Sequence, residues 1–312
     1  MDLFYVAAGL VLLVFGGDAL VKGAVSLALR LGIPALIVGL TVVAFGTSAP
    51  ELLVSVNAAL NGQAGIALGN VVGSNIANIL LILGLPALIA TIHTSLLDTR
   101  RGYVVMLATA LLLIVLSFLG PFTWWHGLIL LVGLALTLWD NLRIARAHRA
   151  ELAAAETPEG ADPGMPGWKI GGLILAGLVG LGFGADLLVD GAVNIARDLG
   201  ISETVIGLTL VAIGTSLPEL VTSVMAAIRK QADVAMGNVI GSNTFNVLAI
   251  LGITSVIAPM EVPPQLLSFD LWVMLGVSLL LVPFIFLKVN IGKAAGLGLV
   301  GGYVAYAIAL VA

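Results

Sequence analysis

The chain has little charge. Asp, Glu, Lys and Arg make up only 10% of its 312 residues, while hydrophobic residues make up 60%. Soluble domains carry about 25% charged residues, so this composition cannot cover a water-facing surface. It predicts a polytopic membrane protein whose partner is the lipid bilayer. The small net charge of −4 and the absence of a basic run give no indication of nucleic-acid binding, and no obligatory protein partner is evident.

Cysteine is absent and histidine is rare. Without cysteine the chain has no disulfide, iron–sulfur cluster or thiolate metal site. His93, His126 and His148 fall near the ends of apolar runs or in a polar stretch and show no metal-binding spacing, so we expect them at the surface. An intramembrane enzyme needs a nucleophile–base pair or a histidine-containing metal site within the membrane. We therefore expect neither an enzyme nor a cofactor.

Ten apolar runs are long enough to cross a bilayer, for which about 20 residues are needed. They are residues 3–28, 35–60, 66–91, 102–119, 123–142, 170–196, 203–228, 234–258, 267–287 and 292–311. One polar stretch, rich in Pro, Gly, Ala and acids, separates the fifth run from the sixth and predicts a linker. The chain therefore divides into five spans at 1–142, a cytoplasmic linker at 143–169 and five more spans at 170–312.

The two halves are copies of each other. Residues 39–84 and 207–252 align without a gap at an offset of 168, with 29 of 46 positions identical. Because five is an odd number, the second half enters the membrane in the opposite sense. The predicted fold is an all-α polytopic membrane protein of ten transmembrane helices, arranged as two inverted five-helix repeats with broken helices at the midplane. This pattern is typical of secondary transporters.

Basic residues are divided unevenly between the two sides of the membrane. If the loops are assigned alternately, eleven of the 13 Lys and Arg residues fall on one side, Arg197 alone falls on the other, and Lys22 lies inside the first run. The positive-inside rule makes the basic side cytoplasmic. We expect a multi-pass protein of the plasma (cytoplasmic) membrane with both termini outside. Lys22 also follows Asp18 by four residues, which predicts an ion pair along one helix.

Each repeat carries a proline directly before a glutamate, inside an apolar run. Pro50 has no N–H for the carbonyl of Gly46, and its ring disrupts the preceding turn, which predicts a broken helix with free carbonyls around residues 44–47. Irregular backbone at this depth is tolerated only where it faces protein or a wet cavity. Oxygen ligands of the kind that suit Ca²⁺ or Na⁺ converge on the break: Thr47, Ser48 and Glu51 in the first copy, and Thr215, Ser216 and Glu219 in the second.

The next run of each repeat supplies a facing polar surface. Polar residues recur there every four positions and so share one helical face: Asn70, Ser74 and Asn78 in the first copy, and Asn238, Ser242 and Asn246 in the second. A GxxxG pair in each copy allows close backbone packing: Gly69 with Gly73, and Gly237 with Gly241. For Asn70, Asn75, Asn238 and Asn243, a place in the ion site and capping of the unwound segments are both open.

Two ionised carboxylates at midmembrane are unfavourable because of desolvation, and more so together because like charges repel. A divalent cation, monovalent ions or protons between them remove that penalty. The empty site is then unfavourable and crossing is easiest when the site is filled, which gives a physical basis for exchange.

The motif GTSxPEL followed by GNxxGSNxxN occurs in both halves and resembles the alpha repeats of the Ca²⁺/cation antiporter superfamily, in its sodium/calcium exchanger branch and prokaryotic members. The resemblance implies exchange of Ca²⁺ for Na⁺ by alternating access, with the first and sixth spans sliding across the rest. It implies that Glu51 and Glu219 ligate Ca²⁺ and share in Na⁺ binding. The remaining implied ligands are the carbonyls of Thr47 and Thr215 for Ca²⁺, Ser48, Ser216, Ser74, Ser242 and the carbonyls of Ala44 and Ala212 for Na⁺, and Asn78 and Asn246 at the centre.

One position departs from part of this family. Some members carry Asp where this chain has Asn246, whereas here both halves carry Asn. Two carboxylates then balance one Ca²⁺, and a candidate proton or potassium site is missing. The proton/calcium branch usually lacks the GTSxPEL wording, which favours Na⁺ as the counter-ion. The alternatives are an H⁺/Ca²⁺ antiporter or a cation channel, which would conduct without a counter-ion gradient.

Overall fold

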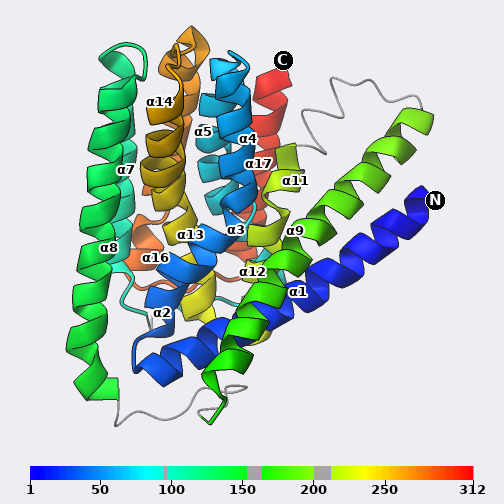
Figure 1. Cartoon of the computed structure of the whole chain (residues 1–312), viewed down its shortest axis with the longest axis vertical. Coiled ribbons are helices and arrows are strands. Elements are labelled where there is room, and N and C mark those ends of the chain that lie inside the picture. The colour runs from blue at the N-terminus through cyan, green and yellow to red at the C-terminus, as the bar shows by residue number, and fades with distance from the viewer. Residues whose placement is uncertain (95–96, 153–163, 200–211, 312) are drawn as a thin grey trace.

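The computed structural model describes the chain except residues 95–96, 153–163, 200–211 and 312 (Figure 1). The described part is built of helices joined by short loops, as the composition predicts. Its first half contains α1 (Asp2–Leu31), α2 (Ala35–Val38), the π-helical segment η1 (Gly39–Val43), α3 (Ala44–Thr47), α4 (Ala49–Leu60), α5 (Ala64–Leu80), α6 (Gly84–Ile89), α7 (Arg100–Phe118) and α8 (Trp124–Leu152).

The second half also consists of helical elements in its described part. It contains α9 (Gly167–Asp198), α11 (Ala212–Thr215), α12 (Leu217–Ile228), α13 (Ala232–Phe245), η4 (Asn246–Leu251), α14 (Gly252–Ile257), η5 (Leu266–Asp270), α15 (Leu271–Leu279), α16 (Val282–Phe286) and α17 (Lys293–Val311).

Nine of the ten predicted spans have a counterpart in the described residues. Eight helices are long and apolar enough to cross a bilayer, and the pair Ala35–Thr47 and Ala49–Leu60, bent by 45°, makes a ninth. The remaining span was predicted at 203–228. Its first part, up to residue 211, lies outside the described residues, and its second part contains α12.

The two longest helices, α1 and α9, pack side by side and cross the rest of the bundle diagonally (Figure 1). Small residues bring their backbones together. A Cβ on Gly9 would lie 2.7 Å from the carbonyl oxygen of Gly184, and a Cβ on Gly177 would lie 2.7 Å from the backbone nitrogen of Leu20. Close backbone approach of this kind is how helices associate in a membrane, where lipid removes most of the hydrophobic driving force.

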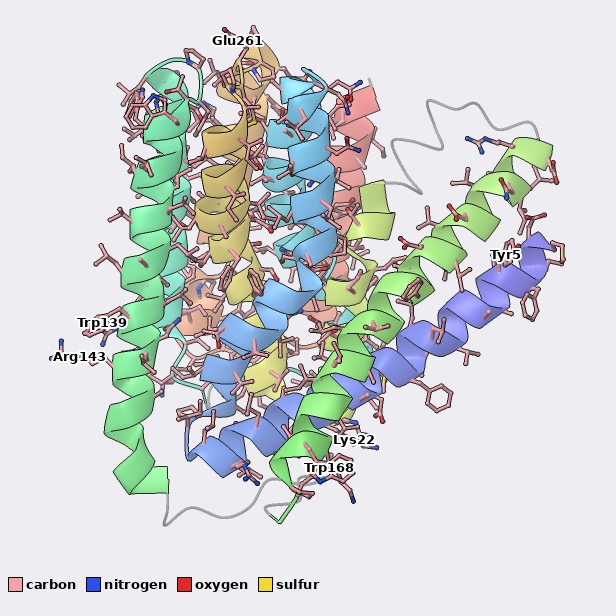
Figure 2. The ribbon with its side chains drawn as sticks, in the orientation of Figure 1. Tyr5, Lys22, Trp139, Arg143, Trp168 and Glu261 are labelled. Carbon is pink, nitrogen blue, oxygen red and sulfur yellow. The ribbon has the colours of Figure 1, made fainter. Side chains whose placement is uncertain are left out.

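An ion pair joins α1 to the end of α12. Asp18 accepts from Lys22 Nζ at 3.0 Å, which confirms the predicted pair along the helix, and also from Arg229 Nε at 2.6 Å, which the sequence did not indicate. Figure 2 shows Lys22 and Trp168 toward one end of the molecule, while Glu261 lies at the opposite end, as does the C terminus.

One histidine prediction is wrong. His126 has only 1% of its surface exposed, because its Nδ1 accepts the backbone N–H of Thr123 at 3.1 Å and its ring stacks on Trp125 at the start of α8. His93 is exposed, as predicted. The side chain of His148 lies outside the described residues.

The polar core of the bundle lies where α4, α5, α12 and α13 meet. α4 packs on α5, α12 packs on α13, and α13 also packs against η1 and α3 of the first half. These are the four helices that carry the repeated motif, so the packing brings both copies to one place.

Candidate functional site

The broken helix predicted in the first repeat is present. α3 ends at Thr47, Ser48 leaves the helical conformation at φ −84° and ψ 9°, and Pro50 lies in the first turn of α4. Among the described residues, no backbone N–H bonds to the carbonyls of Gly46 or Thr47 across this break. The carbonyl of Ala44 is different, because it accepts the N–H of Ser48 at 3.1 Å. The prediction of free carbonyls is therefore confirmed for Gly46 and Thr47 and wrong for Ala44.

The second repeat breaks at the equivalent residue. Ser216 has φ −91° and ψ 6°, between the end of α11 and the start of α12, and Pro218 lies in the first turn of α12. Ser216 is buried and Thr215 is half-buried. Ala212 begins α11 directly after the undescribed residues 200–211, and its side chain is not among those described.

The two glutamates are buried and each is held by the opposite half. Glu51 and Glu219 are each 1% exposed. Ser48 Oγ donates to Glu219 Oε1 at 2.9 Å, and Ser216 Oγ donates to Glu51 Oε1 at 3.3 Å. Since each serine lies three residues before the glutamate of its own half, these crossed bonds bring the two breaks and the two carboxylates around one centre.

Asparagines on the facing helices support the backbone of the glutamates. Asn70 Nδ2 donates to the carbonyl oxygen of Glu51 at 3.2 Å and to Ser55 Oγ at 2.9 Å. Asn238 makes the equivalent pair of contacts in the second half, at 3.2 and 3.1 Å. Its Oδ1 also lies 3.2 Å from Thr47 Oγ1, whose one hydroxyl proton has the carbonyl oxygen of Val43 as another acceptor at 3.1 Å.

Further along the same helices, the amides cross between halves. Asn78 Nδ2 donates to Asn243 Oδ1 at 2.9 Å, and Asn246 Nδ2 donates to Asn75 Oδ1 at 3.0 Å. Asn75 and Asn243, whose role the sequence left open, therefore contact the residues expected at the centre rather than capping an unwound segment. In the sequence, the only indication of a role for Asn75 and Asn243 is that each directly follows a serine of the shared polar face.

Several buried oxygens of the predicted ligands have no hydrogen-bond partner. They are Glu51 Oε2, Glu219 Oε2, Asn78 Oδ1, Asn246 Oδ1 and Ser242 Oγ, five of the nine such side-chain atoms in the described part of the chain. A buried polar atom is unfavourable unless it is paired, and a buried charge more so. Carboxylate, amide and hydroxyl oxygens are the ligands of hard cations such as Ca²⁺ and Na⁺. The cluster fits a cation.

The composition of the centre limits which metals suit it. No group of three or more His, Cys, Asp or Glu side chains that would hold a metal ion occurs among the described residues. Sites for zinc or copper use imidazole and thiolate ligands. Here two carboxylates are supplemented by neutral oxygens, which suits a hard cation of low or intermediate charge.

A cavity of about 260 Å³ reaches this centre from one side, and both Ser74 and Ser216 line it. Asp270 lines the same cavity and accepts from Tyr306 Oη at 3.0 Å. It is an acid of the predicted span 267–287 that was not among the predicted site residues. Asp270 has no counterpart in the first half, where Gly102 occupies the equivalent position. The repeat pattern therefore gave no signal for it.

Close packing is described at only one of the two glycine pairs. A Cβ on Gly241 would lie 2.7 Å from Ala44 Cβ and 2.8 Å from the carbonyl oxygen of Leu40, so the predicted close packing is confirmed there. A Cβ on Gly69 or Gly73 would meet no described atom within 4 Å, and both glycines line the cavity, so close packing of this pair stays a prediction. The position equivalent to Leu40 is 208, which lies outside the described residues.

The sequence of the chain matches a known protein family over nearly its whole length. The profile of the family described as "Sodium/calcium exchanger protein" matches residues 1–140 and 169–312. The chain belongs to the sodium/calcium exchanger family. Members of this family are membrane transporters and not enzymes, as the sequence predicts for this chain.

Relatives of this exchanger-family chain match nearly its whole length. It is 34% identical over 337 residues to the sodium/calcium exchanger MaX1 of Methanosarcina acetivorans, covering 97% of this chain and 96% of the relative. It is 37% identical over 303 residues to the putative antiporter CaxA of Alkalimonas amylolytica, covering 96% and 93%. Among solved structures, the sodium-calcium exchanger NCX_Mj soaked with Na⁺ and Ca²⁺ matches with a TM-score of 0.83 at 35% identity, covering 99% of this chain and 97% of that one.

Proposed function

We propose that this chain exchanges Ca²⁺ for Na⁺ across the cytoplasmic membrane, by alternating access at one midmembrane site built from Glu51 and Glu219. The observation that carries the proposal is the crossed pair of serine–glutamate bonds, which supports one centre shared by both carboxylates. Each carboxylate there keeps one buried oxygen without a partner. Ca²⁺ and Na⁺ compete for these oxygens, so the two ions cannot occupy the site together.

Charge balance explains why the ions must alternate. Two ionised carboxylates in a buried site repel each other, and a site without cations is unfavourable. One Ca²⁺ neutralises both, and Na⁺ ions replace it when their concentration is high. Because the charged site is most easily moved when it is filled, passage in one direction is coupled to passage in the other, which distinguishes an antiporter from a channel.

The ligand set we propose extends from the glutamates to the two helix breaks. The carbonyls of Thr47 and Thr215 complete the Ca²⁺ site, and Asn78 and Asn246 line its centre. The flanking Na⁺ sites use Ser48, Ser216, Ser74 and Ser242, with the carbonyls of Ala44 and Ala212. Support comes from the free carbonyl of Thr47 and from the buried, unpartnered oxygens of Asn78, Asn246 and Ser242.

For the architecture, we propose ten spans in two inverted five-helix repeats, at 1–142 and 170–312, with the linker 143–169 in the cytoplasm and both termini outside. Two observations support it: the nine spans of the described residues, and the helix breaks at Ser48 and Ser216, which are equivalent positions of the two halves. One of the solved structures of NCX_Mj was obtained with Na⁺ and Ca²⁺ and another with Na⁺ and Sr²⁺, and the relative MaX1 is named a sodium/calcium exchanger. Both favour Na⁺ over H⁺ as the counter-ion.

The coupling ion is tested with purified protein in proteoliposomes. Vesicles loaded with Na⁺ are diluted into Na⁺-free buffer that contains ⁴⁵Ca²⁺, and a parallel set carries a proton gradient at equal Na⁺ on both sides. We expect uptake that requires the outward Na⁺ gradient. Uptake driven only by the proton gradient would assign the chain to H⁺/Ca²⁺ exchange. Uptake that follows the Ca²⁺ gradient alone, with neither a Na⁺ gradient nor a proton gradient, would indicate a channel.

A further inference from the structure

The four asparagines at the crossing of α5 and α13 form a closed arrangement that neither half makes alone. All four side chains are at most 3% exposed: Asn75, Asn78, Asn243 and Asn246. Besides the two bonds between side chains, Asn75 Nδ2 donates to the backbone oxygen of Asn243, and Asn243 Nδ2 donates to the backbone oxygen of Asn75, both at 3.3 Å. Every one of these bonds joins one half to the other.

An asparagine ligand has a difficulty that a carboxylate ligand does not have. Its two ends are nearly equal in shape, but the oxygen attracts a cation and the NH₂ group repels it. A half-turn of the amide exchanges the two. An amide at a cation site therefore binds well only if something else fixes which end faces the ion.

The hydrogen bonds fix this orientation step by step for Asn246. A backbone carbonyl can only accept, so the backbone oxygen of Asn243 requires the NH₂ end of Asn75. The oxygen of Asn75 then points the other way and can accept only the NH₂ end of Asn246. The oxygen of Asn246 is left buried and without a partner. The same sequence of bonds, starting from the backbone oxygen of Asn75, orients Asn78 through Asn243.

We propose that Asn75 and Asn243 are positioning residues, each of which locks the central asparagine of the opposite half with its amide oxygen toward the transported cation. This inference rests on the proposed function, because it assigns Asn78 and Asn246 as cation ligands. It also gives each half control over a ligand of the other. The lock is needed in this chain because both central positions carry Asn.

The test is a double-mutant cycle on the full-length protein, read as the dissociation constant for ⁴⁵Ca²⁺ in equilibrium binding. Asn75→Ala removes the acceptor that orients Asn246, and we expect Ca²⁺ to bind about 10- to 100-fold more weakly, as for loss of other residues that orient metal ligands. In an Asn246→Asp background the ligand has an oxygen at both ends. There, Asn75→Ala should change the constant by no more than about twofold, the scatter of independent mutations.

A matched control comes from the other central residue. Asn78 lies on the same helix as Asn75 but is oriented by Asn243. In an Asn78→Asp background, Asn75→Ala should therefore still weaken binding about 10- to 100-fold. The mirror cycle, Asn243→Ala with Asn78→Asp, should behave as the first cycle does, and it serves if Asn75→Ala does not fold.

The outcomes are separable. An equal loss in the native and Asn246→Asp backgrounds would show that Asn75 only supports the fold, and no loss in the native background would show that it orients nothing; either result overturns the inference. If the wild-type protein itself binds no Ca²⁺, the proposed function fails first, and the inference fails with it.

Discussion

Replacing Gly241 by Ala tests how closely α13 packs against the broken span of the first half. The added methyl would lie 2.7 Å from Ala44 Cβ and 2.8 Å from the carbonyl oxygen of Leu40, where ordinary contacts begin at 3.4 Å. One of these atoms is backbone, so relief requires the helices to separate. Overpacking of this kind costs about 1–3 kcal/mol. The gain in helix propensity from Gly to Ala returns about 1 kcal/mol at most.

The expected result is a lower melting temperature for Gly241→Ala, by about 2–4 °C for each kcal/mol lost. Weaker Ca²⁺ binding should accompany it, because the displaced Ala44 begins the helix that carries Thr47. The assay is thermal unfolding of purified protein in nanodiscs, followed by ⁴⁵Ca²⁺ binding. Gly298→Ala is the control, since a Cβ there meets no described atom within 4 Å. If Gly241→Ala melts at or above the control, the close packing of α13 on this span is wrong.

Two further predictions follow from the contacts at the site and from the topology. Asn238→Ala should lower the melting temperature more than Asn70→Ala, because Asn238 is fully buried and Asn70 is half-buried, so that water cannot replace the bonds that Asn238 donates to the Glu219 carbonyl and to Ser223 Oγ. Each buried group left unpaired costs about 1–3 kcal/mol, and equal shifts in thermal unfolding would contradict this. Because the chain has no cysteine, single cysteines report sidedness directly: Glu261→Cys should react with an impermeant thiol reagent from outside intact cells, and Trp168→Cys only after lysis. The reverse pattern would invert the proposed topology.

Much of the site follows from the sequence because it depends on local chemistry. Pro50 breaks its helix wherever the helix lies, since the missing N–H and the ring act within one turn. Glu51 was identified because an acid inside an apolar run needs a functional reason. Because the two halves align at an offset of 168 residues, the same helix break and the same functional acid are predicted at Pro218 and Glu219. Local rules and an internal copy were sufficient for these residues.

What the sequence did not predict depends on contacts between segments distant in the chain. The local sequence does not indicate whether Ser48 bonds to Glu219 or to the glutamate of its own half, because the bond depends on how the two halves pack. The role of Asn75 was undecided for the same reason, since capping a nearby turn and contacting Asn246 need the same side chain. Asp270 has no copy in the other half, so the repeat could not identify it.

The central claim is that one site with two carboxylates binds Ca²⁺ and Na⁺ in turn, and the most direct measurement is Na⁺-gradient-driven ⁴⁵Ca²⁺ uptake by Glu51→Gln and Glu219→Gln in proteoliposomes. Asp270→Asn is the matched control, because it removes another buried intramembrane carboxyl group while leaving an acceptor for Tyr306. We expect both glutamine variants to fold, as shown by an unchanged elution profile, and to lose uptake, while Asp270→Asn retains it. Uptake near the wild-type rate by both glutamine variants would contradict the account.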